Sequence, residues 1–198
     1  MQRHLSSQEK ILAAFGRLIE KAPFSSIRVT MVSEEANVSQ QTFYRLYDNK
    51  YDLAIHFFEN QLFAAVTLCG KRSTIKEIMM AILMIIRNNS RMYTNLLCDE
   101  EGVRLFPEIL KKISHEWTGF SPAWATTIIN TQILIEWANK RFTDPPEDVY
   151  YRYISSLPAY ELLSKEELAA KIKEYESLQD KDFANRKHDR IHVNEKNR

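Results

Sequence analysis

Apolar residues recur along most of the chain at the three- and four-residue spacing of amphipathic helices. Between residues 11 and 19 they fall on one face, and Ser6 with Glu9 forms the S-x-x-E pattern that caps a helix start. Pro23 ends this first segment. Further stripes predict helices over residues 29–36, 39–47 and 50–69. The pattern therefore predicts an all-α fold.

Helical spacing continues after Gly70, where the sequence predicts a second and larger helical unit. Thr74 and Glu77 cap an apolar helix over 75–86, and Gly102 breaks the chain before another over 103–117. Helices over about 121–140, 146–157 and 164–175 follow. From residue 179 onward the chain is polar, mixed in charge and without an apolar face. The predicted organisation is a three-helix unit over 1–49, a helical domain over 50–178 and a disordered tail over 179–198.

Composition narrows the class of protein. The formal net charge of +1 excludes a protein that coats nucleic acid with a strongly basic tail. It neither supports nor excludes a sequence-specific DNA-binding protein. Cys69 and Cys98 stand apart, which favours buried thiols over a disulfide scaffold or metal site. The polar N-terminus is unlike a secretory signal, and the apolar run over 78–86 is too short to span a bilayer. We expect a cytoplasmic protein with no membrane contact.

Catalytic patterns are weak. The five histidines are scattered, and only His188 and His192 share a helical spacing, within the polar tail. The sequence has no nucleophile elbow, phosphate loop or HExxH motif. We expect no enzyme activity, no metal site and no cofactor.

Residues 28–53 hold the most informative pattern. Two helical stripes are joined by a tight turn at Asn37, a residue type that tolerates left-handed backbone. In the second helix, Phe43 and Tyr47 can anchor one face, while the outward residues are hydrogen-bonding groups at the N-terminal end. The residues alone leave two interpretations open, a DNA-reading helix and a helical hairpin with a solvated polar face.

The stretch FSSIRVTMVSEEANVSQQTFYRLYDNKYDL resembles the DNA-binding signature of the TetR (tetracycline-repressor-like) family. That signature has a small-residue turn, Val-Ser, two variable residues, Thr-hydrophobic-Tyr, an aromatic residue and a Lys three positions further on. The matching positions are Ala36-Asn37-Val38-Ser39, Thr42-Phe43-Tyr44, Tyr47 and Lys50. Two positions depart from it, because Asn37 replaces the usual Gly and Ser33 the usual Ala. The resemblance covers the N-terminal third of the chain. It implies a helix-turn-helix followed by a helical effector-binding and dimerisation bundle.

The resemblance also implies how the second helix meets DNA. Gln40 and Gln41, with Thr30, would read base edges, since an amide can pair with adenine in the major groove. Thr42, Tyr44 and Lys50 would contact phosphates, and Ser39 caps the helix. Position and charge add Arg28 and Arg45. The predicted DNA-binding residues are Arg28, Thr30, Ser39, Gln40, Gln41, Thr42, Tyr44, Arg45 and Lys50. Interhelical packing for Tyr44 and a solvated charge for Arg28 stay open.

The predicted function is a sequence-specific transcription regulator, a repressor that binds double-stranded operator DNA as a homodimer. Its helices over 121–141 and 146–157 are apolar on more than one side, which favours a dimer interface over simple core packing. The predicted interface residues are Trp124, Ile128, Leu134, Ile135, Val149 and Tyr153.

A small apolar or aromatic effector is expected to bind in the C-terminal domain, with polar anchors such as Tyr93, His115 or Asn130. The predicted lining is Met79, Leu83, Met92, Tyr93, Phe106, Ile109, Ile113, Trp117 and Trp124. Met and aromatic residues at helical spacing more often form plain core packing than line a ligand pocket. Control by a protein partner rather than a small molecule is the alternative, which a solid core would favour.

Overall fold

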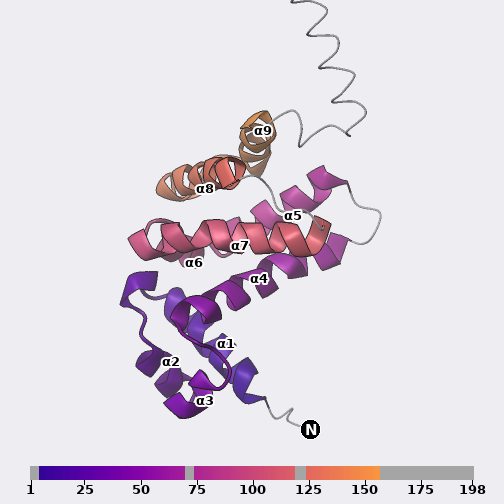
Figure 1. Ribbon diagram of the computed structural model, residues 1–198. Coiled ribbons are helices and arrows are strands. Elements are labelled where there is room, and N and C mark those ends of the chain that lie inside the picture. Colours follow the sequence, from indigo (N-terminus) through magenta and orange to yellow (C-terminus); the bar gives the residue numbers. More distant parts are fainter. Residues whose placement is uncertain (1–4, 70–73, 119–123, 157–198) are drawn as a thin grey trace, which may run out of the picture. The chain divides into compact units, whose positions relative to one another are not determined.

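The computed structural model describes residues 5–69, 74–118 and 124–156. All regular structure within these ranges is helical, which confirms the all-α prediction (Figure 1). The helices are α1 (Ser7–Ile19), the 3-10 helix η1 (Phe24–Ser26), α2 (Val29–Glu35), α3 (Gln40–Tyr44), α4 (Lys50–Cys69), α5 (Ile75–Asn88), α6 (Ser90–Leu97), α7 (Glu100–Thr118), α8 (Trp124–Asn139) and α9 (Pro146–Ser156). The helix expected over 164–175, the start of the helix expected over about 121–140 and the polar tail lie outside the described residues.

Local capping explains where several helices begin. The Ser6 hydroxyl accepts a hydrogen bond from the Glu9 backbone N–H, and the Glu9 carboxylate accepts one from the Ser6 N–H. Thr74 and Glu77 form the same reciprocal pair at the start of α5. Each pair satisfies backbone donors that a helix start leaves without intrahelical partners. These two capping boxes therefore form as the sequence predicts.

An aromatic cluster joins the N-terminal helices to the C-terminal ones. Phe15 of α1 packs edge-to-face on Phe57 of α4, with ring centroids 5.1 Å apart. The neighbouring Phe58 contacts Tyr93 of α6 at 5.4 Å, and Tyr93 contacts Phe106 of α7 at 6.5 Å. Residues Met1–Ser156 accordingly cluster into one compact unit, and α4 leads from α1 toward α5 and α7 (Figure 1). The functional division between residues 49 and 50 stays a prediction.

The α6–α7 region differs from the sequence prediction. No helix was expected over α6, and Gly102 was expected to break the chain, yet α7 begins at Glu100 and continues through Gly102. A Cβ at position 102 would lie 2.1 Å from the Leu96 carbonyl oxygen. Glycine here thus permits a close approach of α7 to α6 rather than ending a helix.

Helix α8 buries polar side chains and exposes apolar ones. Thr126, Thr127, Asn130 and Thr131 are all buried. Trp124, Ile128 and Ile129 on the same helix are 55%, 42% and 43% exposed. In this first half of α8 the arrangement is the reverse of an ordinary surface helix, whereas the second half buries Leu134, Trp137 and Ala138.

None of the described helices is both long enough and apolar enough to cross a membrane.

Candidate nucleic-acid interface

Helices α2 and α3 are joined by a tight turn whose backbone conformation explains the residues found there. Asn37 has a φ of 52°, in the left-handed region that favours glycine and that asparagine tolerates. The Val38 N–H then donates to the Ser33 carbonyl at 3.0 Å. The Ser33 side chain is buried, and its hydroxyl has no hydrogen-bond partner among the residues that the structure describes. The two positions that depart from the resembled signature therefore suit the residues usual there. The left-handed backbone at position 37 suits Gly, and the buried site at position 33 suits Ala.

Helix α3 is short and firmly anchored. Phe43 is fully buried and Tyr47 is 3% exposed, while the Tyr47 hydroxyl hydrogen-bonds His56 Nδ1 of α4 at 3.1 Å. The Ser39 hydroxyl caps α3 by accepting from the Thr42 N–H at 3.1 Å. The helix ends at Tyr44, earlier than the expected Tyr47, and Leu46 is 37% exposed.

The outward side of α3 presents the residues predicted to read bases. Gln40 and Gln41 are exposed in its first turn, as is Thr30 on the adjacent α2. The N-terminal end of such a helix is the part that reaches base edges in the major groove. These three polar residues are therefore exposed on α3 and on the helix that packs against it.

The residues predicted to contact phosphates differ in their exposure and in their hydrogen-bond partners. Tyr44 is 55% exposed and touches Phe43 edge-to-face, so its ring does not fill a gap between helices. The Thr42 hydroxyl lies 3.0 Å from the Ser39 hydroxyl, so it already has one hydrogen-bond partner. Arg28 and Arg45 are exposed, and within the described part of the chain no ion pair involves either of them.

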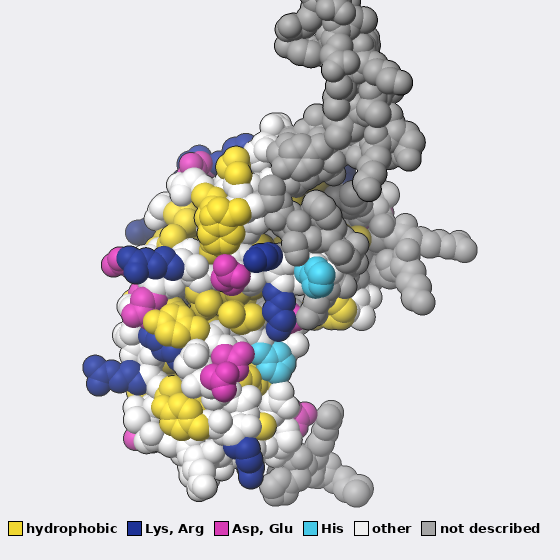
Figure 2. All heavy atoms as spheres, in the orientation of Figure 1, with side chains coloured by type: hydrophobic (Ala, Val, Ile, Leu, Met, Phe, Trp, Pro, Cys, Tyr) yellow, Lys and Arg dark blue, Asp and Glu magenta, His cyan; other side chains and the backbone are white. Residues whose placement is uncertain are grey.

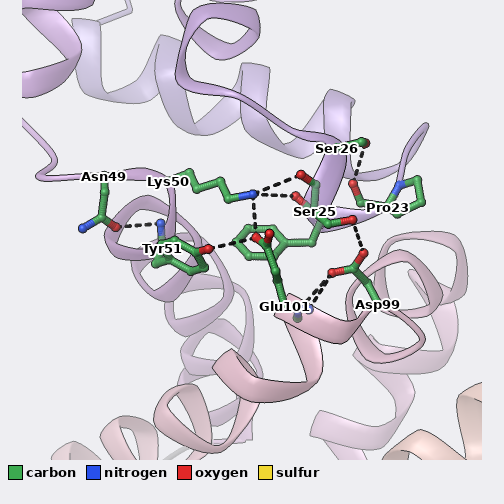
Figure 3. A network of polar contacts seen from close by, with 10 residues as sticks. Pro23, Ser25, Ser26, Asn49, Lys50, Tyr51, Asp99 and Glu101 are labelled. Atoms are coloured by element: carbon green, nitrogen blue, oxygen red, sulfur yellow. Dashed lines mark hydrogen bonds and ion pairs between the residues drawn. The ribbon is translucent and has the colours of Figure 1, made fainter.

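Lys50 does not lie where a free phosphate-binding lysine would. Its Nζ donates to the carbonyl oxygens of Phe24 at 3.3 Å and Ser25 at 3.2 Å, and lies 2.7 Å from Glu101 Oε2 (Figure 3). The Lys50 side chain is 15% exposed, and its ammonium also sits 4.7 Å from the Phe24 ring centroid. In this structure the Lys50 ammonium is therefore paired within the chain, and the phosphate contact expected from the sequence stays a prediction.

The face drawn in Figure 2 shows Lys and Arg side chains interspersed with Asp and Glu. No patch of one charge sign covers that face, consistent with the formal net charge of +1. DNA affinity would then depend on a few placed contacts rather than on a broad basic surface.

The predicted effector-lining residues fall into three environments. Leu83, Met92, Tyr93, Phe106, Ile109 and Ile113 are buried, and Met79 is partly buried. Trp124 is exposed, so it does not line the core, and the side chain of Trp117 lies outside what the structure describes.

The three expected polar anchors also differ in their surroundings. His115 is exposed, and Asn130 accepts a hydrogen bond from the Ser156 hydroxyl at 3.3 Å. Tyr93 is fully buried and its hydroxyl has no hydrogen-bond partner among the described residues. Tyr93 is therefore the anchor with an unused donor and acceptor inside the core.

Two of the residues predicted at the dimer interface are buried within the chain. Leu134 is 8% exposed and Val149 is 1% exposed, because both pack inside the chain where α8 meets its neighbours. Trp124 and Ile128 are exposed as expected, while Ile135 and Tyr153 are partly buried. Ile129 and Tyr151, which the sequence pattern did not single out, are 43% and 58% exposed.

A polar junction between η1, α4 and α7 was also missed. The Tyr51 hydroxyl donates to Glu101 Oε2 at 2.9 Å, and the Ser25 hydroxyl donates to Asp99 Oδ2 at 2.5 Å (Figure 3). Asp99 Oδ1 accepts from the backbone N–H groups of Glu101 and Gly102, both at 3.1 Å. The sequence signal is only an acidic run before a glycine, which names no partner.

Within the described ranges, no group of three or more His, Cys, Asp or Glu residues could hold a metal ion.

Comparisons with known proteins give similarity of structure only. No family model matches the chain, and no curated protein matches its sequence. Among solved structures, the dihydroxyacetone kinase operon activator DhaS is 15% identical, with a TM-score of 0.46 over 75% of this chain and 92% of that one. The TetR-family repressor AlkX from Dietzia sp. is 17% identical, with a TM-score of 0.44 over 76% and 94%. A TetR-family regulator from Rhodococcus sp. is 17% identical, with a TM-score of 0.44 over 76% and 96%.

AlkX and the regulators from Rhodococcus sp. and Shewanella sp. are described as TetR-family proteins. At such identities and TM-scores the likeness concerns the fold alone.

Proposed function

We propose that this protein is a sequence-specific DNA-binding transcription regulator that reads its operator with α3. The observation that carries the proposal is the orientation of α3. Buried Phe43 anchors the helix, and Gln40 and Gln41 are exposed in its first turn. Thr30, Tyr44, Arg28 and Arg45, on α3, α2 or their caps, are also exposed and offer hydrogen-bonding and cationic groups suited to bases and phosphates.

The proposed regulator works as a homodimer. One short recognition helix reads few bases, whereas a two-fold dimer addresses two half-sites about 34–36 Å apart. The exposed apolar residues of α8 and α9, namely Trp124, Ile128, Ile129 and Tyr151, supply a surface of the kind that marks an interface. Light scattering that shows a monomer at micromolar concentrations would contradict this part of the proposal.

Repression is the proposed mode of action, relieved by an effector in the C-terminal core. Two buried polar atoms support a site there, because Tyr93 Oη and Gln61 Oε1 have no hydrogen-bond partner in the described part of the chain. Gln61 follows Phe58 by three residues on α4, and Phe58 packs on Tyr93. An effector with an apolar or aromatic body and one hydroxyl or amide group would satisfy such atoms. Its differential affinity for two conformations would then set the change in DNA affinity.

Binding-site selection from a random duplex pool tests the proposed function. The wild type should enrich a two-fold consensus. Gln40→Ala and Gln41→Ala should each lose preference at specific positions, at about 1–3 kcal/mol on the selected site and much less on random DNA. Asn60→Ala, which removes an exposed amide from α4, is the matched control and should keep the wild-type consensus. The assigned reading face is wrong if both glutamine variants keep the full consensus, and failure of the wild type to enrich any sequence refutes the function.

A further inference from the structure

The ammonium of Lys50 is fully occupied inside the protein. A lysine ammonium has three donors, and Lys50 Nζ has three acceptors within reach: the carbonyl oxygens of Phe24 and Ser25, and Glu101 Oε2 (Figure 3). A DNA phosphate could gain a hydrogen bond from Lys50 only if one of these acceptors gave way. Of the three acceptors, Glu101 is the one that a phosphate most readily replaces. A phosphate oxygen is anionic like a carboxylate oxygen and forms a charge-assisted hydrogen bond of similar length with an ammonium.

The two members of this ion pair belong to different parts of the chain. Lys50 is the first residue of α4 and is held against η1, directly beside the helix-turn-helix. Glu101 lies in the first turn of α7, where the Asp99 carboxylate accepts from its backbone N–H and Gly102 packs on the carbonyl of Leu96. The position of the carboxylate therefore depends on α6 and α7, whereas that of the ammonium depends on η1 and α4.

Glu101 is also held in place from the α4 side. The Tyr51 hydroxyl donates to the same Oε2 atom that Lys50 contacts, at 2.9 Å. The Lys50 and Tyr51 hydrogen bonds lower the pKa of Glu101, so the carboxylate is charged at neutral pH. The Glu101 side chain is nevertheless 37% exposed, so the pair borders on solvent and can be reached by another anion.

We propose that Glu101 is an intramolecular competitor for DNA: its carboxylate holds Lys50 away from the phosphate backbone, and DNA affinity depends on whether α7 keeps or releases this lysine. The inference rests on the proposed function, since it concerns how that DNA-binding surface is regulated. Glu101 acts through Lys50 as a positioning residue and makes no contact with DNA itself. Displacement of α7 away from η1 would free one cation at the edge of the helix-turn-helix.

The salt dependence of DNA binding distinguishes this role from a purely structural one. Each new phosphate contact by a cation makes the slope of log K against log salt steeper by about 0.9, equivalent to about eightfold in affinity at about 0.1 M salt. Loss of a structural ion pair would weaken the fold without adding a phosphate contact. The slope is therefore the decisive quantity.

The experiment uses a fluorescein-labelled duplex from the enriched pool and measures anisotropy over a salt series. Glu101→Gln keeps the size of the side chain and an acceptor for Tyr51 but removes the charge that holds Lys50. Glu100→Gln is the matched control, because the neighbouring Glu100 is highly exposed and pairs only with Arg104 among the described residues. Lys50→Met keeps an aliphatic stem over the Phe24 ring and removes the ammonium.

We expect Glu101→Gln to bind the duplex about eightfold more tightly at about 0.1 M salt, with a slope steeper by about one. Adding Lys50→Met should remove both gains, and Glu100→Gln should behave as the wild type. An unchanged slope in a Glu101→Gln protein that is folded by circular dichroism overturns the proposal. So does a gain that survives in the Lys50→Met/Glu101→Gln double variant, since the carboxylate would then act by its own charge.

The same series separates this inference from the function on which it rests. A wild-type protein that binds no duplex refutes the proposed function itself. A wild-type protein that binds duplex DNA, with a Glu101→Gln variant of identical slope, refutes only the competition between Glu101 and phosphate. A slope that falls by about one in the single Lys50→Met variant also refutes it, because Lys50 would already be on a phosphate in the wild-type complex.

Discussion

Replacing Tyr93 by Phe removes a single oxygen atom from a ring that is fully buried between Phe58 and Phe106. That hydroxyl has no hydrogen-bond partner in the described part of the chain, and burial raises the pKa of Tyr93 so that it stays protonated. An unsatisfied buried polar group costs about 1–3 kcal/mol relative to solvent. The gap left by the oxygen offsets part of this gain, so we expect the free energy of unfolding to rise by about 1 kcal/mol.

Tyr47→Phe is a matched control with the opposite expected sign. Tyr47 is also buried, but its hydroxyl hydrogen-bonds His56 Nδ1 at 3.1 Å. Removing this hydrogen bond should lower the free energy of unfolding by about 0.5–1.5 kcal/mol. The two substitutions are chemically identical, so a difference in sign reports the hydrogen-bonding state of each hydroxyl.

Urea unfolding followed by far-ultraviolet circular dichroism measures both effects, at one fixed protein concentration because a dimer couples stability to concentration. In a thermal scan, a gain of about 1 kcal/mol corresponds to a Tm about 2–4 °C higher for a chain of this size. If Tyr93→Phe is destabilised as much as Tyr47→Phe, with unchanged m-values, the Tyr93 hydroxyl is satisfied internally. This outcome would refute a hydrogen-bonding effector beside Tyr93.

Two further predictions concern the α6–α7 junction. Gly102→Ala should lower the free energy of unfolding by about 1–3 kcal/mol, although alanine usually favours a helix, because its Cβ would lie 2.1 Å from the Leu96 carbonyl oxygen; calorimetry showing a stabilised variant would contradict this close approach. Burial raises the pKa of Asp99, but hydrogen bonds from the Ser25 hydroxyl and the Gly102 and Glu101 N–H groups outweigh it, and the net pKa is lowered from the ordinary 3.8. A lowered folded-state pKa means that the stability contribution is present above 3.8 and is lost as the pH falls through the folded-state pKa. Between about pH 5 and pH 2, the free energy of unfolding should therefore fall more steeply with decreasing pH for the wild type than for Asp99→Asn. Equal pH dependence in the two proteins would show that the Asp99 carboxylate is not the group that titrates.

The sequence was sufficient wherever a structural feature depends on near neighbours in the chain. The capping boxes at Ser6 and Thr74 form because each needs only residues three apart. The left-handed turn at Asn37, the cap at Ser39 and the bounds of α4 were likewise predictable from local spacing. The exposure of Gln41 also follows, because it lies two positions before the buried Phe43 in the same helix and so faces away from it.

Tertiary packing decided what local spacing could not. The apolar spacing predicted that the helix now seen as α8 is apolar on more than one side. Only the packing showed that Leu134 is internal while Ile128 and Ile129 are exposed. Glycine is a residue type that breaks helices, yet Gly102 lies inside α7, where the backbone of Leu96 approaches it closely.

Lys50 shows the same limit at the proposed DNA surface. The resemblance assigned this lysine to a phosphate, because the motif records which residue stands at a position and not which anion lies nearest. In the structure that anion is the Glu101 carboxylate, which comes from a helix 50 residues further along the chain. Ion pairing depends on distance in space, and folding alone brings α7 to the start of α4.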